Sequence, residues 1–186
     1  MKKILLAVLV SFISFTTYAQ TQLSSKMTKG LEVEVDDFNG GIKYTAKSVG
    51  LSVLSKLDSC VFIWVLNCSD LTPAGFSKVQ ILVNGKVTEI NFTLDEYKEY
   101  AETIRVPRNT FSGGKMATTF INEDRYIAEI KLDASKYLDL LYDIVNDKND
   151  VKIRFSGNKD YDGIYNKKKK VEIKAILDVS KALSDI

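Results

Sequence analysis

Residues 76–92 have the sequence "FSKVQILVNGKVTEINF", and this stretch decides the fold class. Its centre is Asn84-Gly85, the dipeptide that tolerates the two positive φ angles of a type I′ turn. Pairing outward from this turn places Leu82 opposite Val87. The turn chemistry and the alternation of apolar residues then agree on a β-hairpin. The apolar side chains that share one face of this register are Val79, Ile81, Ile90 and Phe92.

Four other stretches have strand patterns. Residues 31–48 alternate in "LEVEV" and again in "IKYTAKS", which predicts a pair of strands joined by the turn-rich "DDFNGG". Residues 60–67, "CVFIWVLN", are apolar on both faces, which is typical of a central strand covered on both sides. "RYIAEIKL" at 125–132 and "KIRF" at 152–155 are the two remaining strand candidates.

Helical spacing of apolar residues marks two segments. Residues 133–147 form one amphipathic stripe behind Asp133, a predicted N-cap, and residues 167–183 form another behind Asn166. Residues 93–104 are ambiguous, because Thr93 and Glu96 make a capping box while the rest fits a short helix or an irregular segment equally well. "PRNTFSGGK", residues 107–115, has the composition of a mobile loop.

These elements predict one α+β domain over residues 20–186. We expect a mostly antiparallel sheet or a two-sheet sandwich of about six to seven strands, with a mid-chain helix and a C-terminal helix. Both sheet arrangements are compatible with the pattern.

The first twenty residues, "MKKILLAVLVSFISFTTYAQ", have the layout of a secretory signal peptide. Two lysines precede an apolar run that is shorter than the ~20 residues needed to span a bilayer. We therefore expect residues 1–19 to be cleaved near Ala19, and the mature chain to be periplasmic or secreted in a bacterium. We expect no membrane span in the mature chain.

Composition excludes several chemistries. The chain has no histidine, which removes Ser-His-Asp and Cys-His catalysis and histidine-ligated zinc. Without Lys2 and Lys3, 24 basic residues stand against 24 acidic ones, so a nucleic-acid partner is disfavoured. Cys60 and Cys68 can form a disulfide after export only if the chain turns back between them, because on one strand they lie too far apart. Two separate thiols are the alternative.

One segment resembles an EF-hand or dockerin-type calcium loop. Asn158, Asp160 and Asp162, followed by Gly163, match the first half of the pattern D-x-[DN]-x-[DN]-G. Lys169 stands where that loop carries its bidentate glutamate, and "KIRF" before the loop is a strand and not a helix. We therefore predict a strand-to-helix turn here. No cofactor is expected, and Ca²⁺ is only the alternative.

The same stretch offers candidate binding residues. The tyrosines beside the acidic turn have apolar rings with polar tips, and we expect them to be exposed for recognition. The lysine run that follows opposes the dipole of the helix it begins, so a solvated face and a patch for an anionic partner both remain open. The candidates are Tyr161, Tyr165, Lys167, Lys168, Lys169 and Lys170.

These observations favour an exported, non-enzymatic binding or structural module whose partner is a protein or an envelope component. One alternative is a hydrolase that uses carboxylates alone, with Asp36/Asp37, Glu123/Asp124 or Asp160/Asp162 as the pair. The other is a calcium-stabilised structural domain that uses residues 158–163.

Overall fold

The computed structural model describes residues 23–36, 41–56 and 59–184, so the predicted signal peptide lies outside the described residues. Within these ranges the chain forms ten β-strands in two antiparallel sheets, together with two α-helices, one mid-chain and one C-terminal. The predicted α+β class is confirmed. Two of the extra strands come from segments predicted as loop, turn or helix, and the third, residues 51–56, comes from a segment for which no element was predicted.

The larger sheet has six strands in the order β1-β2-β3-β4-β8-β7. Its strands β1 and β2 are the strand pair predicted over residues 31–48, with Val35 opposite Ile42. Cys60 and Cys68 both lie in β4 as free thiols. The strand bounds are β1 (Glu32–Asp36), β2 (Gly41–Ala46), β3 (Leu51–Lys56), β4 (Ser59–Asp70), β7 (Tyr97–Ser112) and β8 (Lys115–Asp133).

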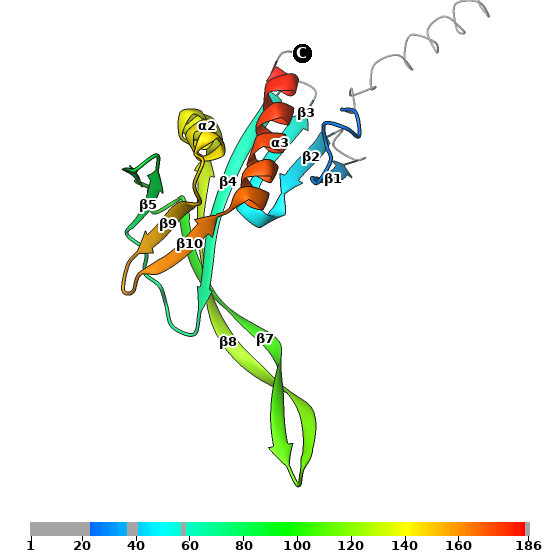
Figure 1. The fold of residues 1–186 in the computed structure, drawn as a ribbon, viewed down its shortest axis with the longest axis vertical. Coiled ribbons are helices and arrows are strands. Elements are labelled where there is room, and N and C mark those ends of the chain that lie inside the picture. Colours follow the sequence, from blue (N-terminus) through cyan, green and yellow to red (C-terminus); the bar gives the residue numbers. More distant parts are fainter. Residues whose placement is uncertain (1–22, 37–40, 57–58, 185–186) are drawn as a thin grey trace, which may run out of the picture.

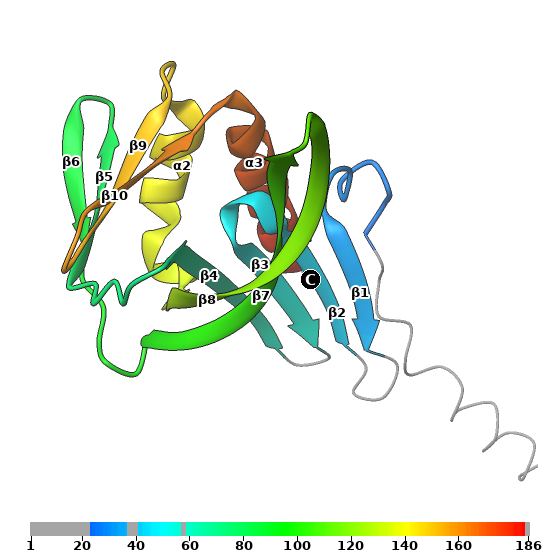
Figure 2. The same ribbon diagram turned by 90° about the horizontal axis from the view of Figure 1, so that it is seen from below.

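Strand β4 is central, as predicted, but only one of its faces is fully covered. Phe62, Trp64 and Leu66 are buried, whereas Val61 on the other face is exposed. The prediction of cover on both sides was wrong, because both helices lie on one side of this sheet (Figures 1 and 2).

The smaller sheet has four strands in the order β10-β9-β5-β6. Strands β5 (Lys78–Val83) and β6 (Lys86–Ile90) form the predicted hairpin, with Leu82 opposite Val87. The turn residues Asn84 and Gly85 have φ angles of 50° and 74°, as a type I′ turn requires. Strands β9 (Val151–Ser156) and β10 (Tyr161–Tyr165) complete the sheet.

The helices begin at the predicted caps. The Asp133 carboxylate accepts a hydrogen bond from the Ser135 amide at the start of a 3₁₀ turn, η2 (Ala134–Tyr137), which leads into α2 (Leu138–Asn146). The Asn166 side-chain oxygen accepts from the Lys169 amide, 3.1 Å away, at the start of α3 (Lys167–Ser184). Local side-chain chemistry therefore fixes the N-termini of η2 and α3, whereas α2 follows η2 directly and has no side-chain cap of its own.

The core lies between the sheets, where Figure 2 shows both helices. Helix α3 packs on β2 and β3, and a 3₁₀ turn, η1 (Lys47–Val49), joins these strands. Trp64 is fully buried and its indole nitrogen donates to the Val49 carbonyl at 3.2 Å. The fully buried residues on the helix-covered face of the six-stranded sheet and on α3 include Tyr44, Leu51, Val53, Ile173, Ile176 and Val179.

Strands β7 and β8 form a long hairpin that projects from the body, as Figure 1 shows at the bottom of the view. Strand β8 pairs with β4 only from Tyr126 to Asp133. Beyond that point the hairpin is a two-stranded ribbon. We call residues 97–133 the arm, residues 105–122 its distal part, and the rest its base.

The arm replaces two predicted elements. Residues 93–104, for which a short helix and an irregular segment were both open, form neither: the Glu96 carboxylate accepts from the Thr93 amide at 2.8 Å, as in a capping box, but this closes only a turn before β7. The expected loop at 107–115 is the arm's tip. Gly113 and Gly114 there have φ angles of 59° and 75° and form a two-residue hairpin turn.

No helix in the described ranges has both the length and the apolar content needed to cross a membrane.

Candidate functional site

The stretch singled out by the sequence folds as a hairpin and not as the predicted strand-to-helix turn. Strand β9 ends at Ser156, the chain reverses, and β10 runs from Tyr161 to Tyr165 before α3 begins. The prediction was wrong because "YDGIY" hydrogen-bonds to a neighbouring strand that its short, Gly-containing pattern does not announce. The candidate residues are thereby divided between the two faces of a sheet.

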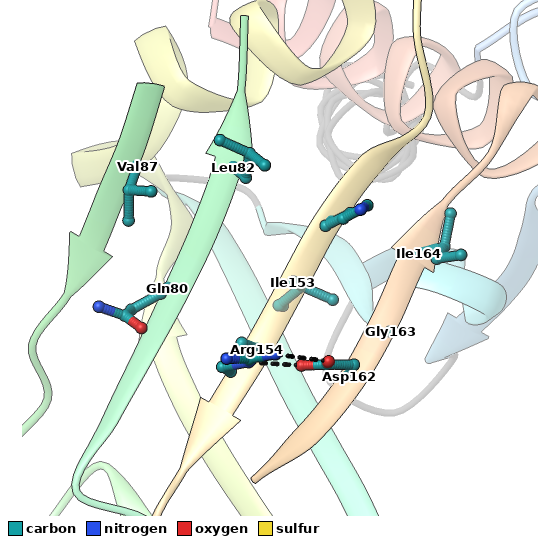
Figure 3. Close-up of a pocket in the computed structure, with 9 residues that line it drawn as sticks. Gln80, Leu82, Val87, Ile153, Arg154, Asp162, Gly163 and Ile164 are labelled. Carbon is teal, nitrogen blue, oxygen red and sulfur yellow. Dashed lines mark hydrogen bonds and ion pairs between the residues drawn. The ribbon is translucent and has the colours of Figure 1, made fainter. Parts of the chain in front are cut away.

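The outer face of the four-stranded sheet has an open hollow of about 460 Å³ (Figure 3). One row of side chains across the four strands consists of Val87, Leu82, Lys152 and Ile164, and the next of Glu89, Gln80, Arg154 and Asp162. The first row is largely apolar and the second is charged. The surface is suited to contact with a ligand that is partly apolar.

The acidic residues of the predicted calcium loop are engaged by an arginine. Two guanidinium nitrogens of Arg154, Nε and Nη2, donate to the Asp162 carboxylate at 2.7 and 2.8 Å (Figure 3). Its Nη1 lies 3.7 Å from Asp160 Oδ2. Asn158 is held against the segment that precedes β5, because its main-chain amide donates to the Ala74 carbonyl. Within the described ranges, no group of three or more Asp, Glu or Cys side chains is placed to hold a metal ion.

This pairing also bears on acid–base chemistry. The hydrogen bonds and charge of Arg154 lower the pKa of Asp162 below its usual value. A general acid of a glycosidase requires the opposite shift, because it must stay protonated near neutral pH. Asp162 is therefore poorly suited to donate a proton.

Of the other two carboxylate pairs, only Glu123/Asp124 lies wholly within the described residues. Asp37 lies outside the described residues. Glu123 and Asp124 lie on β8 and not in a loop, so their side chains point to opposite faces of the ribbon. Glu123 pairs with Arg125 at 2.9 Å, and Asp124 accepts from the Thr103 hydroxyl at 2.6 Å.

Tyr161 is half-buried rather than exposed. Its ring packs edge-on against Phe76, and its hydroxyl donates to the Asp70 carboxylate at the end of β4. Lys159 donates to the same carboxylate at 3.1 Å. These bonds, that of Tyr161 first, lower the pKa of Asp70 to about 2, and the bond to Asp70 raises the pKa of Tyr161 to about 12.

Tyr165 is buried, and burial raises the pKa of its hydroxyl. The expectation of two exposed tyrosines was wrong because successive residues of β10 alternate between solvent and the core. The tyrosines take the inward positions 161 and 165, while Asp162 and Ile164 point outward.

The lysine run is also divided. Lys167 and Lys168 are exposed, Lys169 is half-buried with its ammonium donating to the Ile164 carbonyl at 3.1 Å, and Lys170 is buried. The Lys170 ammonium donates to the main-chain carbonyls of Asp147 and Asn149, which follow the end of α2. Lys170 therefore has a structural role at a helix C-terminus, where a cation is favourable.

The arm carries the exposed apolar residues that sequence reasoning missed. Phe111, Met116 and Phe120 are 77, 72 and 56% exposed. The β7–β8 register sets Phe111 opposite Met116 and Pro107 opposite Phe120, so all four share one face. Gly113-Gly114 was the available signal, because Gly-Gly between two β-rich runs is a type I′ hairpin pattern.

The charges of the arm are segregated along its length. The distal part has three cations, Arg105, Arg108 and Lys115, and no acidic residue. Residues 97–104 and 123–130 carry five carboxylates and two cations. The guanidinium of Arg105 lies over the Phe120 ring, 4.8 Å from its centroid. The distal part thus combines exposed rings with net positive charge.

Comparison with known proteins gave no match to a protein-family model, a curated protein or a solved structure.

Proposed function

We propose that this protein is an exported, non-enzymatic binding module whose arm docks on a component of the bacterial envelope. The observation that carries the proposal is the exposure of Phe111, Met116 and Phe120 on one face of a ribbon that projects from the body. A two-stranded hairpin is only marginally stable alone in water, and exposed apolar patches of this kind mark interaction sites. A partner that covers this face would stabilise the ribbon.

The chemistry of the remaining residues supports a role without catalysis. The chain has no histidine, Asp162 is ion-paired, and Glu123 and Asp124 are each engaged by a neighbour on the arm. The hollow of Figure 3 is less suited than the arm to bind an apolar partner, because Lys152 interrupts its row of apolar side chains. In this proposal it is a secondary contact surface.

Site-specific photo-crosslinking tests the proposal. A photoreactive phenylalanine analogue at position 120 should give adducts in intact cells that produce the exported protein. The same analogue at position 94 should give none, although Leu94 is 90% exposed on the turn before β7. Equal labelling from both positions would contradict a specific role for the arm.

A variant with a shortened arm provides a second test. Replacing residues 105–122 by Asn-Gly would join Ile104 to Glu123, which are directly opposite in the register, through a two-residue turn. The variant should keep its fold and lose envelope association, whereas Leu94→Ser should retain it. Envelope association unchanged by the shortening would overturn the proposal.

A further inference from the structure

The apolar face of the distal arm is the continuation of a buried face. Residues of β7 and β8 pair without a bulge from Tyr97 opposite Ile130 to Ser112 opposite Lys115. Side chains alternate regularly along such a ladder, so Phe120 and Met116 share the face of the buried Ala128 and Ile130. In the body this face is covered by the core. On the distal arm the same face meets solvent.

The charge of the distal arm narrows the chemistry of its partner. Arg105, Arg108 and Lys115 stand within a segment that has no carboxylate to neutralise them. Arginine matches phosphate oxygens with paired donors, and lysine binds phosphate as a point charge. Exposed aromatic and apolar residues flanked by such cations are typical of surfaces that enter the headgroup region of anionic lipid.

A second copy of the chain fits this surface poorly. If two arms overlapped fully in antiparallel orientation, Phe111 and Met116 would lie against the acidic base of the partner arm. If only the distal parts overlapped, the three cations of each copy would meet and repel. Neither arrangement buries the exposed apolar side chains and also pairs the charges.

We propose that the distal arm inserts tip-first into the headgroup region of an anionic lipid surface, an inference that rests on the proposed docking function of the arm. The most exposed apolar pair, Phe111 and Met116, lies one residue pair behind the Gly113-Gly114 turn and is the apolar pair that enters deepest. Lys115 and Arg108 are the cations nearest the phosphates, whereas Arg105, six residues from Phe111 and so roughly 20 Å along the strand, stays on the solvent side of the headgroups. The acidic base keeps the body away from the surface, so the charge pattern along the arm orients the molecule.

Tryptophan fluorescence of the mature chain tests this insertion. Phe111→Trp places a reporter at the tip, while the native Trp64 is fully buried and gives a constant background. Vesicles of equal parts phosphatidylglycerol and phosphatidylcholine should shift the emission of Phe111→Trp to shorter wavelength, and brominated lipid should quench it. Leu94→Trp, the matched reporter on the body, should show neither effect.

Flotation with the same vesicles measures the electrostatic contribution. Replacing Arg108 and Lys115 by glutamine should weaken partitioning by about fivefold for each cation removed, because a cation near an anionic surface contributes about 1 kcal/mol. Added salt should weaken it as well. Vesicles of phosphatidylcholine alone should bind more weakly than the mixture.

Three results would overturn the lipid proposal. One is no emission shift with anionic vesicles; another is equal binding by the wild type and the Phe111→Ser/Met116→Ser variant. The third is a concentration-dependent dimer whose Phe111→Trp emission is already shifted without lipid, which would assign the arm to self-association. If vesicles fail but position 120 still crosslinks to an envelope protein, the docking function stands and only the lipid assignment falls.

Discussion

The hydroxyl of Tyr161 donates a hydrogen bond to the carboxylate of Asp70, which ties β10 of the four-stranded sheet to the end of β4 in the six-stranded sheet. Lys159 adds an ion pair to the same carboxylate. Asp70 also accepts from the Leu71 amide at 2.6 Å. This carboxylate therefore holds together the end of one sheet and the hairpin of the other.

Asp70 should contribute to stability in a defined pH range. The bond from Tyr161 is the largest cause that lowers its pKa to about 2, below the usual value of about 3.9 for an aspartate. A depressed pKa stabilises the fold above the usual value, and this contribution is lost as the pH falls through about 2. The difference in free energy of unfolding between wild type and Asp70→Asn should therefore shrink between these values, as urea titrations at a series of pH values would show.

The contribution of Tyr161 to stability has the opposite pH dependence, because it is lost as the pH rises. Hydrogen bonding to Asp70 raises the pKa of Tyr161 to about 12, so its contribution is present below the usual value of about 10 and disappears as the pH rises through about 12. Tyr161→Phe should remove the alkaline dependence and reduce the acid one, because the Leu71 amide and Lys159 still donate to Asp70. Asp95→Asn, on the exposed turn before β7, is the control and should leave both profiles unchanged. Identical profiles for wild type and Tyr161→Phe would contradict the assignment.

Lys170→Met should destabilise the protein by about 1–3 kcal/mol, because it leaves the carbonyls of Asp147 and Asn149 without their donor. Lys168→Met, two residues earlier on the exposed side of α3, should change the free energy of unfolding by less than about 0.5 kcal/mol. Urea denaturation of both variants gives the comparison. Equal losses would mean that net charge, and not the cap on α2, determines the effect.

Gly50→Ala should be far more damaging than Gly85→Ala. Both glycines have positive φ angles, 69° and 74°, so either alanine is strained by about 1–2 kcal/mol. A Cβ at Gly50 would also lie 1.9 Å from the Val65 carbonyl oxygen, whereas a Cβ at Gly85 meets nothing within 4 Å. Thermal unfolding should show the larger loss for Gly50→Ala, and a similar melting temperature for the two variants would refute the close approach.

Calcium should leave the melting temperature of the wild type unchanged. Arg154 engages both Asp160 and Asp162, so a cation would first have to displace the guanidinium. Asp160→Ala should respond to calcium as the wild type does. Arg154→Gln is the informative variant, because it frees both carboxylates. A calcium-dependent rise in the wild type that Asp160→Ala abolishes would restore the calcium-stabilised alternative.

The predictable parts of this fold are those fixed by neighbours in sequence. Asn84-Gly85 sets a turn through its own backbone preferences, and Asp133 and Asn166 cap helices through bonds to residues two or three positions away. The strand pair at 31–48 is specified by its own alternation. For these elements the information lies within a few residues of where it acts.

Gly113-Gly114 marks the turn of the arm, but the length of its strands could not be predicted by the same means. Tyr97, Ala101 and Ile104 have helical spacing, yet β8, which begins only at Lys115, supplies the hydrogen bonds that make residues 97–112 a strand. The binding candidates were misplaced for a related reason. Whether Tyr165 or Lys170 is buried depends on where the sheet and α2 lie, which no pattern within "GIYNKKKK" encodes.

The packing of α3 has a consequence for the order of events in synthesis. Ile173, Ile176 and Leu177 belong to the last helix of the chain, which lies on β2 and β3 near its beginning, and the Ser48 hydroxyl donates to Glu172 at 2.6 Å across 124 residues. A nascent chain that has not yet released α3 leaves the first strands uncovered. The domain therefore completes its core only after α3 has been synthesised and has reached the first strands.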